Sequence, residues 1–296
     1  MAETIVVRKE HGLPYSKGVM AQALTATGLG IGRAFELARV IERRLDERGA
    51  PQISVADLDA LAEGVLRDEE GDDAVRRYRD LRRLARLDRP LVVLLAGTTG
   101  VGKSTLATML AHRLGITRVI ATDVIRQVLR AFFSHDFMPA VHYSAYEAGK
   151  AVEGDTGDPD IIGYRAQARS VGTGIEAIVA RACKEGTPIV VEGVHLTPGS
   201  LDPQLRERCV AVEALVTVGD EEMHRGHFSL RGRQRPADRY LAHFHQIRKL
   251  QEYLGRKAED AGVAVIENVH VDEALAELMD LVLAAAGRAA EGDEHQ

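Results

Sequence analysis

The feature that most constrains this chain is the glycine-rich segment at residues 97–104. It reads Gly-Thr-Thr-Gly-Val-Gly-Lys-Ser and fits the phosphate-loop pattern G-x-x-x-x-G-K-[ST]. The apolar run Leu91–Ala96 precedes it and predicts a buried parallel strand. Apolar residues at helical spacing follow it as far as Gly115, which is a helix stop signal. Strand, loop and helix in this order are the context that the motif needs, so a chance glycine-rich turn is a poor alternative.

Such a loop binds nucleotide phosphates. Glycines let the backbone adopt positive φ, so that successive N–H groups form an anion nest at the positive end of a helix. Lys103 can reach the outer phosphates, and the Ser104 hydroxyl can hold Mg²⁺. The sequence therefore predicts ATP and Mg²⁺, with ATP held by Gly97, Thr98, Thr99, Gly100, Val101, Gly102, Lys103, Ser104 and Thr105.

Length and composition favour a two-domain enzyme. The 296 residues exceed the ~150 typical of one domain, and 45% hydrophobic residues can form sizeable cores. The net charge of −6 argues against a general nucleic-acid binder. Cys183 and Cys209 lack metal-site spacing and are interpreted as reduced thiols. Without an apolar run near ~18 residues or a signal-peptide pattern, we expect a cytoplasmic protein with no membrane partner.

Residues 1–88 are predicted to form a small, mostly helical domain with one short strand at residues 5–9. This domain resembles the ATP-cone, a regulatory nucleotide-binding module at the N-terminus of ribonucleotide reductases. The resemblance rests on residues 7–12, Lys17 and residues 78–82. It implies that a second nucleotide lies against Arg8, Lys9 and Lys17. The alternative, a helical cap with solvated basic residues, remains open.

Two acidic residues follow predicted strands of the second domain, residues 89–296. Asp123 comes after the strand at residues 118–121 and can orient or deprotonate an acceptor hydroxyl, or else act as the N-cap of the helix at residues 124–133. Glu192 stands at the carboxyl end of the strand at residues 188–191 and fits the position of the acid that assists Mg²⁺.

Substrate-binding residues are expected in and around the irregular segment at residues 133–162. Arginines in the flanking helices are candidates for holding an anionic substrate, namely Arg126, Arg130, Arg165 and Arg169. A lid is expected at about residues 220–239, where arginines could close over the phosphates; the alternative is an exposed basic loop. His224 and His227 lie in it without acid or cysteine partners at ligand spacing, which argues against zinc.

Further apolar strands are predicted at residues 210–218 and 263–268, with helices at 236–256 and 272–286. Five buried strands separated by helices predict a doubly wound α/β domain. With the phosphate loop on the first strand, the expected parallel strand order is 2-3-1-4-5, as in nucleotide and small-metabolite kinases.

Over nearly its whole length the chain resembles the archaeal 2-phosphoglycerate kinase family. The matching pieces are LPYSKG at 13–18, YRDLR at 78–82, GTTGVGKS at 97–104, LGI at 114–116, TDVIR at 122–126, VEGVH at 191–195, HF at 227–228 and IENV at 266–269. The resemblance implies ATP-dependent phosphorylation of 2-phosphoglycerate to 2,3-bisphosphoglycerate. The chain departs from the family at residues 148–159 and 229–239, where we expect the substrate to be recognised.

The motifs and the resemblance together assign an expected role to each candidate site residue. Lys103 and the loop amides hold ATP, Ser104 and Glu192 organise Mg²⁺, and Asp123 orients the acceptor hydroxyl. The arginines expected at the transferring phosphoryl group or ATP are Arg231, Arg233 and Arg235, and the residues expected at the phosphorylated substrate are Arg126, Arg165 and His195. Two alternatives stay open: a kinase of another small hydroxyl substrate, such as glycerate or an inositol phosphate, and a non-catalytic ATP sensor. The oligomeric state is left open as well.

Overall fold

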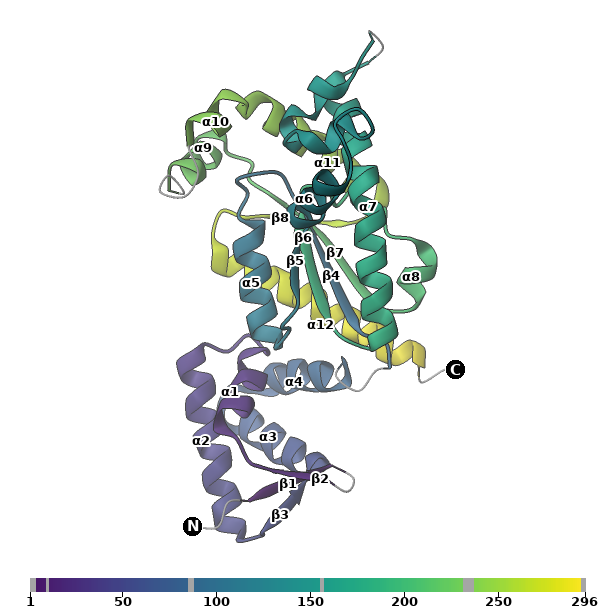
Figure 1. The fold of residues 1–296 in the computed structure, drawn as a ribbon. Helices are drawn as coiled ribbons and strands as arrows, with labels where there is room; N and C mark the ends of the chain where they lie inside the picture. The colour runs from purple at the N-terminus through teal and green to yellow at the C-terminus, as the bar shows by residue number, and fades with distance from the viewer. Residues whose placement is uncertain (1–3, 9–10, 85–87, 155–156, 231–236, 294–296) are drawn as a thin grey trace. The chain divides into compact units, whose positions relative to one another are not determined.

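The computed structural model describes residues 4–8, 11–84, 88–154, 157–230 and 237–293. The chain divides into two compact units (Figure 1). One comprises residues 1–87 with the short pieces 113–115 and 286–296, and the other comprises residues 88–112 and 116–285.

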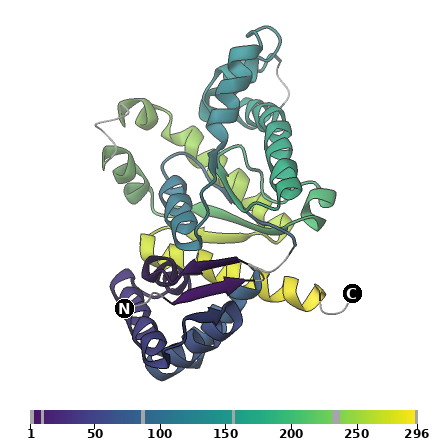
Figure 2. The same cartoon turned by 60° about the horizontal axis from the view of Figure 1, so that its bottom comes forward.

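The N-terminal unit contains a small sheet of strand order β2-β1-β3, which Figure 2 shows from below. Strand β1 (Ile5–Arg8) pairs antiparallel with β2 (His11–Pro14) and parallel with β3 (Gln52–Ser54). The sequence predicted one short strand at residues 5–9, whereas Gly12 and Pro14 lie in a second strand that forms the other arm of a hairpin. Proline is tolerated there because β2 is an edge strand.

Four helices complete this unit: α1 (Lys17–Thr25), α2 (Ile31–Arg48), α3 (Val55–Glu70) and α4 (Asp72–Leu84). Their apolar faces form one core that includes Leu24, Leu37, Ile41, Val65 and Tyr78. Ser54 caps α3, because its hydroxyl accepts a hydrogen bond from Asp57 N at 3.0 Å.

The second unit is built on a five-stranded parallel sheet of order β5-β6-β4-β7-β8. The strands are β4 (Leu91–Ala96), β5 (Val119–Ala121), β6 (Ile189–Gly193), β7 (Val210–Thr217) and β8 (Ala264–Glu267). Counted from the loop-bearing β4, this is the predicted order 2-3-1-4-5, and the α/β fold class is confirmed. Every residue of the central strands β4 and β6 is buried, as continuous apolar runs require.

Helices cover the two faces of this sheet (Figure 1). The helices that follow the first strand of this sheet along the chain are α5 (Lys103–Leu114), α6 (Thr122–Phe132), α7 (Pro159–Glu185), α8 (Pro203–Glu207), α9 (Glu221–Leu230), α10 (Ala237–Ala242), α11 (Phe244–Ala261) and α12 (Val271–Asp293). Of these, α9 and α10 lie beyond the end of the sheet and do not cover its faces (Figure 1). The apolar residues of α7 and α11 form one core with Val92, Leu94 and Ala96 of β4. None of the helices in the described ranges is long and apolar enough to cross a membrane.

Two segments differ from the sequence prediction. The segment predicted to be irregular contains two 3₁₀ helices, η1 (Pro139–His142) and η2 (Ala145–Ala151). The first half of the predicted lid is helix α9, because Asp220 Oδ1 accepts a hydrogen bond from Met223 N at 2.6 Å and Glu221 and Glu222 lie in its first turn.

Candidate active site

The phosphate loop has the backbone that its motif predicts. Gly97, Gly100 and Gly102 adopt φ values of 153°, 94° and 85°, which side-chain-bearing residues rarely take. At Gly97 an added Cβ would lie 2.7 Å from the carbonyl oxygen of Val216, so glycine is needed there for space as well. The loop follows β4 and leads directly into α5, which places its amides at a helix N-terminus.

Lys103, Ser104 and Glu192 meet at the base of the loop. Ser104 Oγ donates to Glu192 Oε1 at 2.9 Å, and Lys103 Nζ lies 3.9 Å from Glu192 Oε2. The meeting is a consequence of strand register, since Glu192 on β6 pairs with Leu95, two residues before the loop. A hydroxyl and a carboxylate are the oxygen ligands that Mg²⁺ takes beside phosphate and water oxygens, so these residues fit that ion.

Asp123 lies in the first turn of α6, beyond the carboxyl end of β5. The alternative of Asp123 as an N-cap is wrong, because α6 begins at Thr122 and its capping residue is Ala121. The carboxylate accepts from Arg126 Nε at 3.2 Å and is 62% exposed. Burial opposes ionisation, but His195 in its protonated form at low pH, together with the cations Arg126 and Lys103, holds the pKa of Asp123 below its ordinary value. Asp123 is therefore an ionised carboxylate at neutral pH.

His195 is 2% exposed and uses both ring nitrogens. Nδ1 is 2.8 Å from Thr122 Oγ1, and Nε2 is 2.9 Å from Gln167 Oε1. Because Gln167 Nε2 donates to two backbone carbonyls, its oxygen must face the imidazole, so His195 carries its proton on Nε2 and accepts from Thr122. Burial lowers the pKa of His195 to about 4, which keeps the ring neutral at pH 7.

Arg126 is 8% exposed and is bound mainly to backbone. Its Nη1 donates to the carbonyl oxygens of Val141 at 3.1 Å and Tyr143 at 3.0 Å. Gln167 Nε2 donates to Tyr143 O at 3.0 Å and to Ala140 O. Arg126 and Gln167 together therefore hold η1 and the residue after it against α6 and α7.

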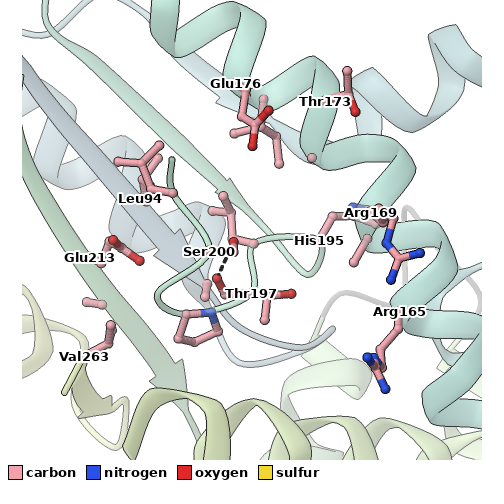
Figure 3. Close-up of a pocket in the computed structure, with 18 of the residues that line it drawn as sticks. Leu94, Arg165, Arg169, Thr173, Glu176, His195, Thr197, Ser200, Glu213 and Val263 are labelled. Carbon is pink, nitrogen blue, oxygen red and sulfur yellow. Dashed lines mark hydrogen bonds between the residues drawn. The ribbon is translucent and has the colours of Figure 1, made fainter. Parts of the chain in front are cut away.

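A cavity of about 360 Å³ opens beside the carboxyl ends of β4 and β6 (Figure 3). Arg165 and Arg169, one turn apart on α7, point toward it, opposite the loop that carries Thr197 and Ser200. Within the described part of the chain, neither arginine has a hydrogen bond or an ion pair. Two unpaired cations beside hydroxyl groups and an apolar floor can bind a small anion.

Two acids also line the cavity, Glu176 and Glu213. Glu213 is already bound, accepting from Gly199 N at 2.9 Å and from Arg206. Its charge is thereby offset, and the two arginines set the charge at their end of the cavity.

The chain is similar throughout its length to curated relatives. It is 35% identical over 283 residues to 2-phosphoglycerate kinase from Methanopyrus kandleri, covering 94% of this chain and 86% of that protein. It is 36% identical over 281 residues to 2-phosphoglycerate kinase from Methanocaldococcus jannaschii, covering 94% of this chain and 91% of that protein.

The chain belongs to the 2-phosphoglycerate kinase family. No protein-family model matches it. Among solved structures, a gluconokinase from Sinorhizobium meliloti 1021 is similar with a TM-score of 0.39 and 17% identity, covering 70% of this chain and 97% of that one.

The residues that the sequence singled out as the site of this kinase-family member do not all gather in one place. Lys103, Ser104 and Glu192 meet at the loop. Arg165 lies at the cavity, whereas Arg126 is bound to backbone carbonyls. His195 lines the cavity but has both nitrogens in use.

Other predicted residues fall elsewhere. Arg231, Arg233 and Arg235 lie outside the described residues, as does Lys9, and Arg8 is described only by its backbone. In the N-terminal unit, Lys17 Nζ lies 3.2 Å from Glu42 Oε2, an ion pair that offsets its charge. The second nucleotide at this unit therefore stays a prediction.

Sequence reasoning missed Gln167 and Asn268, whose partners lie 28 and 167 residues away. It also missed that His224 and His227 reach the phosphate loop. No local pattern marks any of these contacts, because each depends on how distant elements pack.

Proposed function

We propose that this protein transfers the γ-phosphoryl group of ATP to 2-phosphoglycerate, giving ADP and 2,3-bisphosphoglycerate. The observation that carries the proposal is similarity to 2-phosphoglycerate kinases over 94% of the chain, including the phosphate loop and the acids beside it. The geometry of the site supports each part of the reaction as follows.

The loop amides and Lys103 hold the ATP phosphates, and the Ser104 hydroxyl and Glu192 carboxylate hold Mg²⁺. The ion would neutralise charge on the phosphate oxygens. Lys103 lies close to the same carboxylate, 3.9 Å from Glu192 Oε2, so its ammonium is held over the loop. These side chains need no rearrangement of the sheet to act, because strand register already brings them together.

In this proposal the acceptor binds in the cavity beside β4 and β6. Its volume of about 360 Å³ suits a three-carbon acid with one phosphate. Arg165 and Arg169 bind the acceptor's carboxylate and phosphate, while neutral His195 forms part of the wall. Arg126 shapes this region by holding the segment at Val141 and Tyr143, rather than by contacting the acceptor.

Asp123 is the group that orients the acceptor hydroxyl. Its lowered pKa keeps it ionised, so it can accept the proton of the C3 hydroxyl as that oxygen attacks the γ-phosphorus. The new O–P bond forms as the bond between the γ-phosphorus and the β,γ-bridging oxygen breaks, and ADP leaves. The lid arginines predicted to neutralise charge on the transferring group remain a prediction.

The test is ADP release in Mg²⁺ and ATP, without acceptor and with 2-phosphoglycerate, 3-phosphoglycerate, glycerate or an inositol phosphate. Strong stimulation by 2-phosphoglycerate, lost in Lys103→Ala with the fold retained by circular dichroism, is the expected result. Stimulation by another acceptor alone would contradict the substrate assignment. ATP binding with no stimulation by any acceptor would favour a nucleotide sensor.

A further inference from the structure

On the outward side of the phosphate loop, each carbonyl oxygen from Thr98 to Val101 accepts a hydrogen bond. In an anion nest the N–H groups point inward, so the carbonyl oxygens point away and need donors of their own. Four consecutive carbonyls have one each, and every donor is a side chain. Thr98 O accepts from Lys103 Nζ at 3.3 Å, Thr99 O from His224 Nε2, Gly100 O from His227 Nδ1 and Val101 O from Asn268 Nδ2, the last three at 2.9 Å.

The two histidines come from one helix face. His224 and His227 are three residues apart on α9, so both side chains project toward the loop. His224 is fully buried, and burial lowers its pKa, so its ring is neutral and its single N–H goes to Thr99 O. The ring of Phe228 stacks on His224 with centroids 5.3 Å apart and completes the contact.

Asn268 comes from the other side, just after β8. It is 2% exposed, and its backbone N–H donates to Thr217 O at 2.8 Å, which fixes it to the end of β7. Its side-chain amide is therefore held in place for the Val101 carbonyl.

These supports explain a glycine that the motif does not require. A Cβ at Gly100, one of the variable motif positions, would lie 2.5 Å from Phe228 Cζ and 2.9 Å from His224 Nε2. At Gly102 it would lie 2.3 Å from Asn268 Nδ2. The loop is pressed against its donors so closely that no side chain fits between them.

We propose that His224, His227 and Asn268 are positioning residues that hold the phosphate loop in its nucleotide-binding conformation. The inference rests on the proposed function only in taking a nucleotide as the ligand of the loop. Lys103 is itself expected to contact the phosphates, so the other three donors carry the support when nucleotide is bound. They place the amides before the ligand arrives, which reduces the conformational cost of binding.

The sharpest variant is Asn268→Asp, which keeps the side-chain shape but places an oxygen opposite the Val101 carbonyl. His227→Leu removes one donor at a half-buried position, and His227→Gln restores an N–H. His245→Leu, at an exposed histidine on α11, is the matched control. The readouts are the Kd of a fluorescent ADP analogue with Mg²⁺ and no acceptor, the thermal midpoint, and the KM of the acceptor.

We expect Asn268→Asp to weaken nucleotide binding about tenfold and His227→Leu severalfold, because each loses one hydrogen bond to the loop and Asn268→Asp adds repulsion between two oxygens. His227→Gln should recover most of the affinity, with the acceptor KM and the thermal midpoint of the His227 variants unchanged. Nucleotide binding equal to wild type in both Asn268→Asp and His227→Leu would overturn the proposal. So would a His227→Leu defect that His227→Gln fails to rescue. Wild-type protein that binds no nucleotide would instead overturn the proposed function.

Discussion

At the scale of single residues, His195 shows how burial decides protonation. Its ring joins Thr122, the first residue of α6, to Gln167 on α7, and it lines the cavity as well. The sequence predicted contact with the substrate from its place after Glu192. The structure adds that the ring is neutral and fully hydrogen-bonded, so it can fix the cavity wall without adding charge to it.

This neutrality has a consequence for stability. The unfolded chain binds a proton at His195 near pH 6.5, and the folded chain only near pH 4. Between these values the unfolded state holds more protons, so the free energy of unfolding falls as pH is lowered through this window. From pH 7 to pH 5 the share of His195 is about 2 kcal/mol. Urea unfolding of wild type and His195→Gln should be measured at pH 7 and pH 5. The free energy of unfolding should fall by about 2 kcal/mol less in the variant than in wild type. Equal decreases would contradict the assignment.

Arg165 and Arg169 provide the second prediction at this scale. Each forms charge-assisted hydrogen bonds with the acceptor in the proposed complex, so Arg165→Gln or Arg169→Gln should raise the acceptor KM about tenfold or more. The KM for ATP should not change, because neither side chain is part of the loop. Arg181→Gln, near the exposed end of the same helix, is the control. An unchanged acceptor KM in both variants would place the acceptor elsewhere.

At the scale of elements, the helices and strands that could be predicted carry local sequence signals, whereas those that could not depend on contacts with distant elements. The five strands and their order follow from apolar runs beside a phosphate loop, which are local signals. Helix α9 carried a local signal too, Asp220 before Glu221 and Glu222, but its histidines and glycine made it look like a loop. The sequences of the 3₁₀ helices η1 and η2 show no periodic pattern of apolar residues. Donors on other helices hold η1, so packing alone determines it.

The dependence of η1 on Arg126 can be measured. Arg126→Leu removes charged hydrogen bonds to Val141 O and Tyr143 O, which should lower the free energy of unfolding by about 2–4 kcal/mol. Hydrogen exchange should rise specifically in residues 138–152. Arg130→Leu, at an exposed position one turn later on α6, should leave exchange there unchanged. Identical exchange in the two variants would show that η1 is held by other contacts.

At the scale of the whole molecule, the charge of the chain and the charge of its proposed ligands have the same sign. The net charge is −6, and both ATP and 2-phosphoglycerate are anions. Binding therefore depends on cations at the site itself, which are Lys103 at the loop and Arg165 and Arg169 at the cavity. The sequence identified Lys103 from a motif. It could not show that Arg126 is hydrogen-bonded to backbone carbonyls while Arg165 and Arg169 are available to a ligand, because these contacts exist only in the folded chain.

In the proposed function, the loop and the cavity act together to phosphorylate the C3 hydroxyl of 2-phosphoglycerate. The most direct measurement is ³¹P NMR of 2-phosphoglycerate, ATP and Mg²⁺ incubated with the protein, beside Lys103→Ala. We predict a second phosphate monoester signal on the acceptor, matching 2,3-bisphosphoglycerate, that grows in step with ADP only in wild type. ADP formation without that signal, or the signal with Lys103→Ala at the wild-type rate, would contradict this reaction.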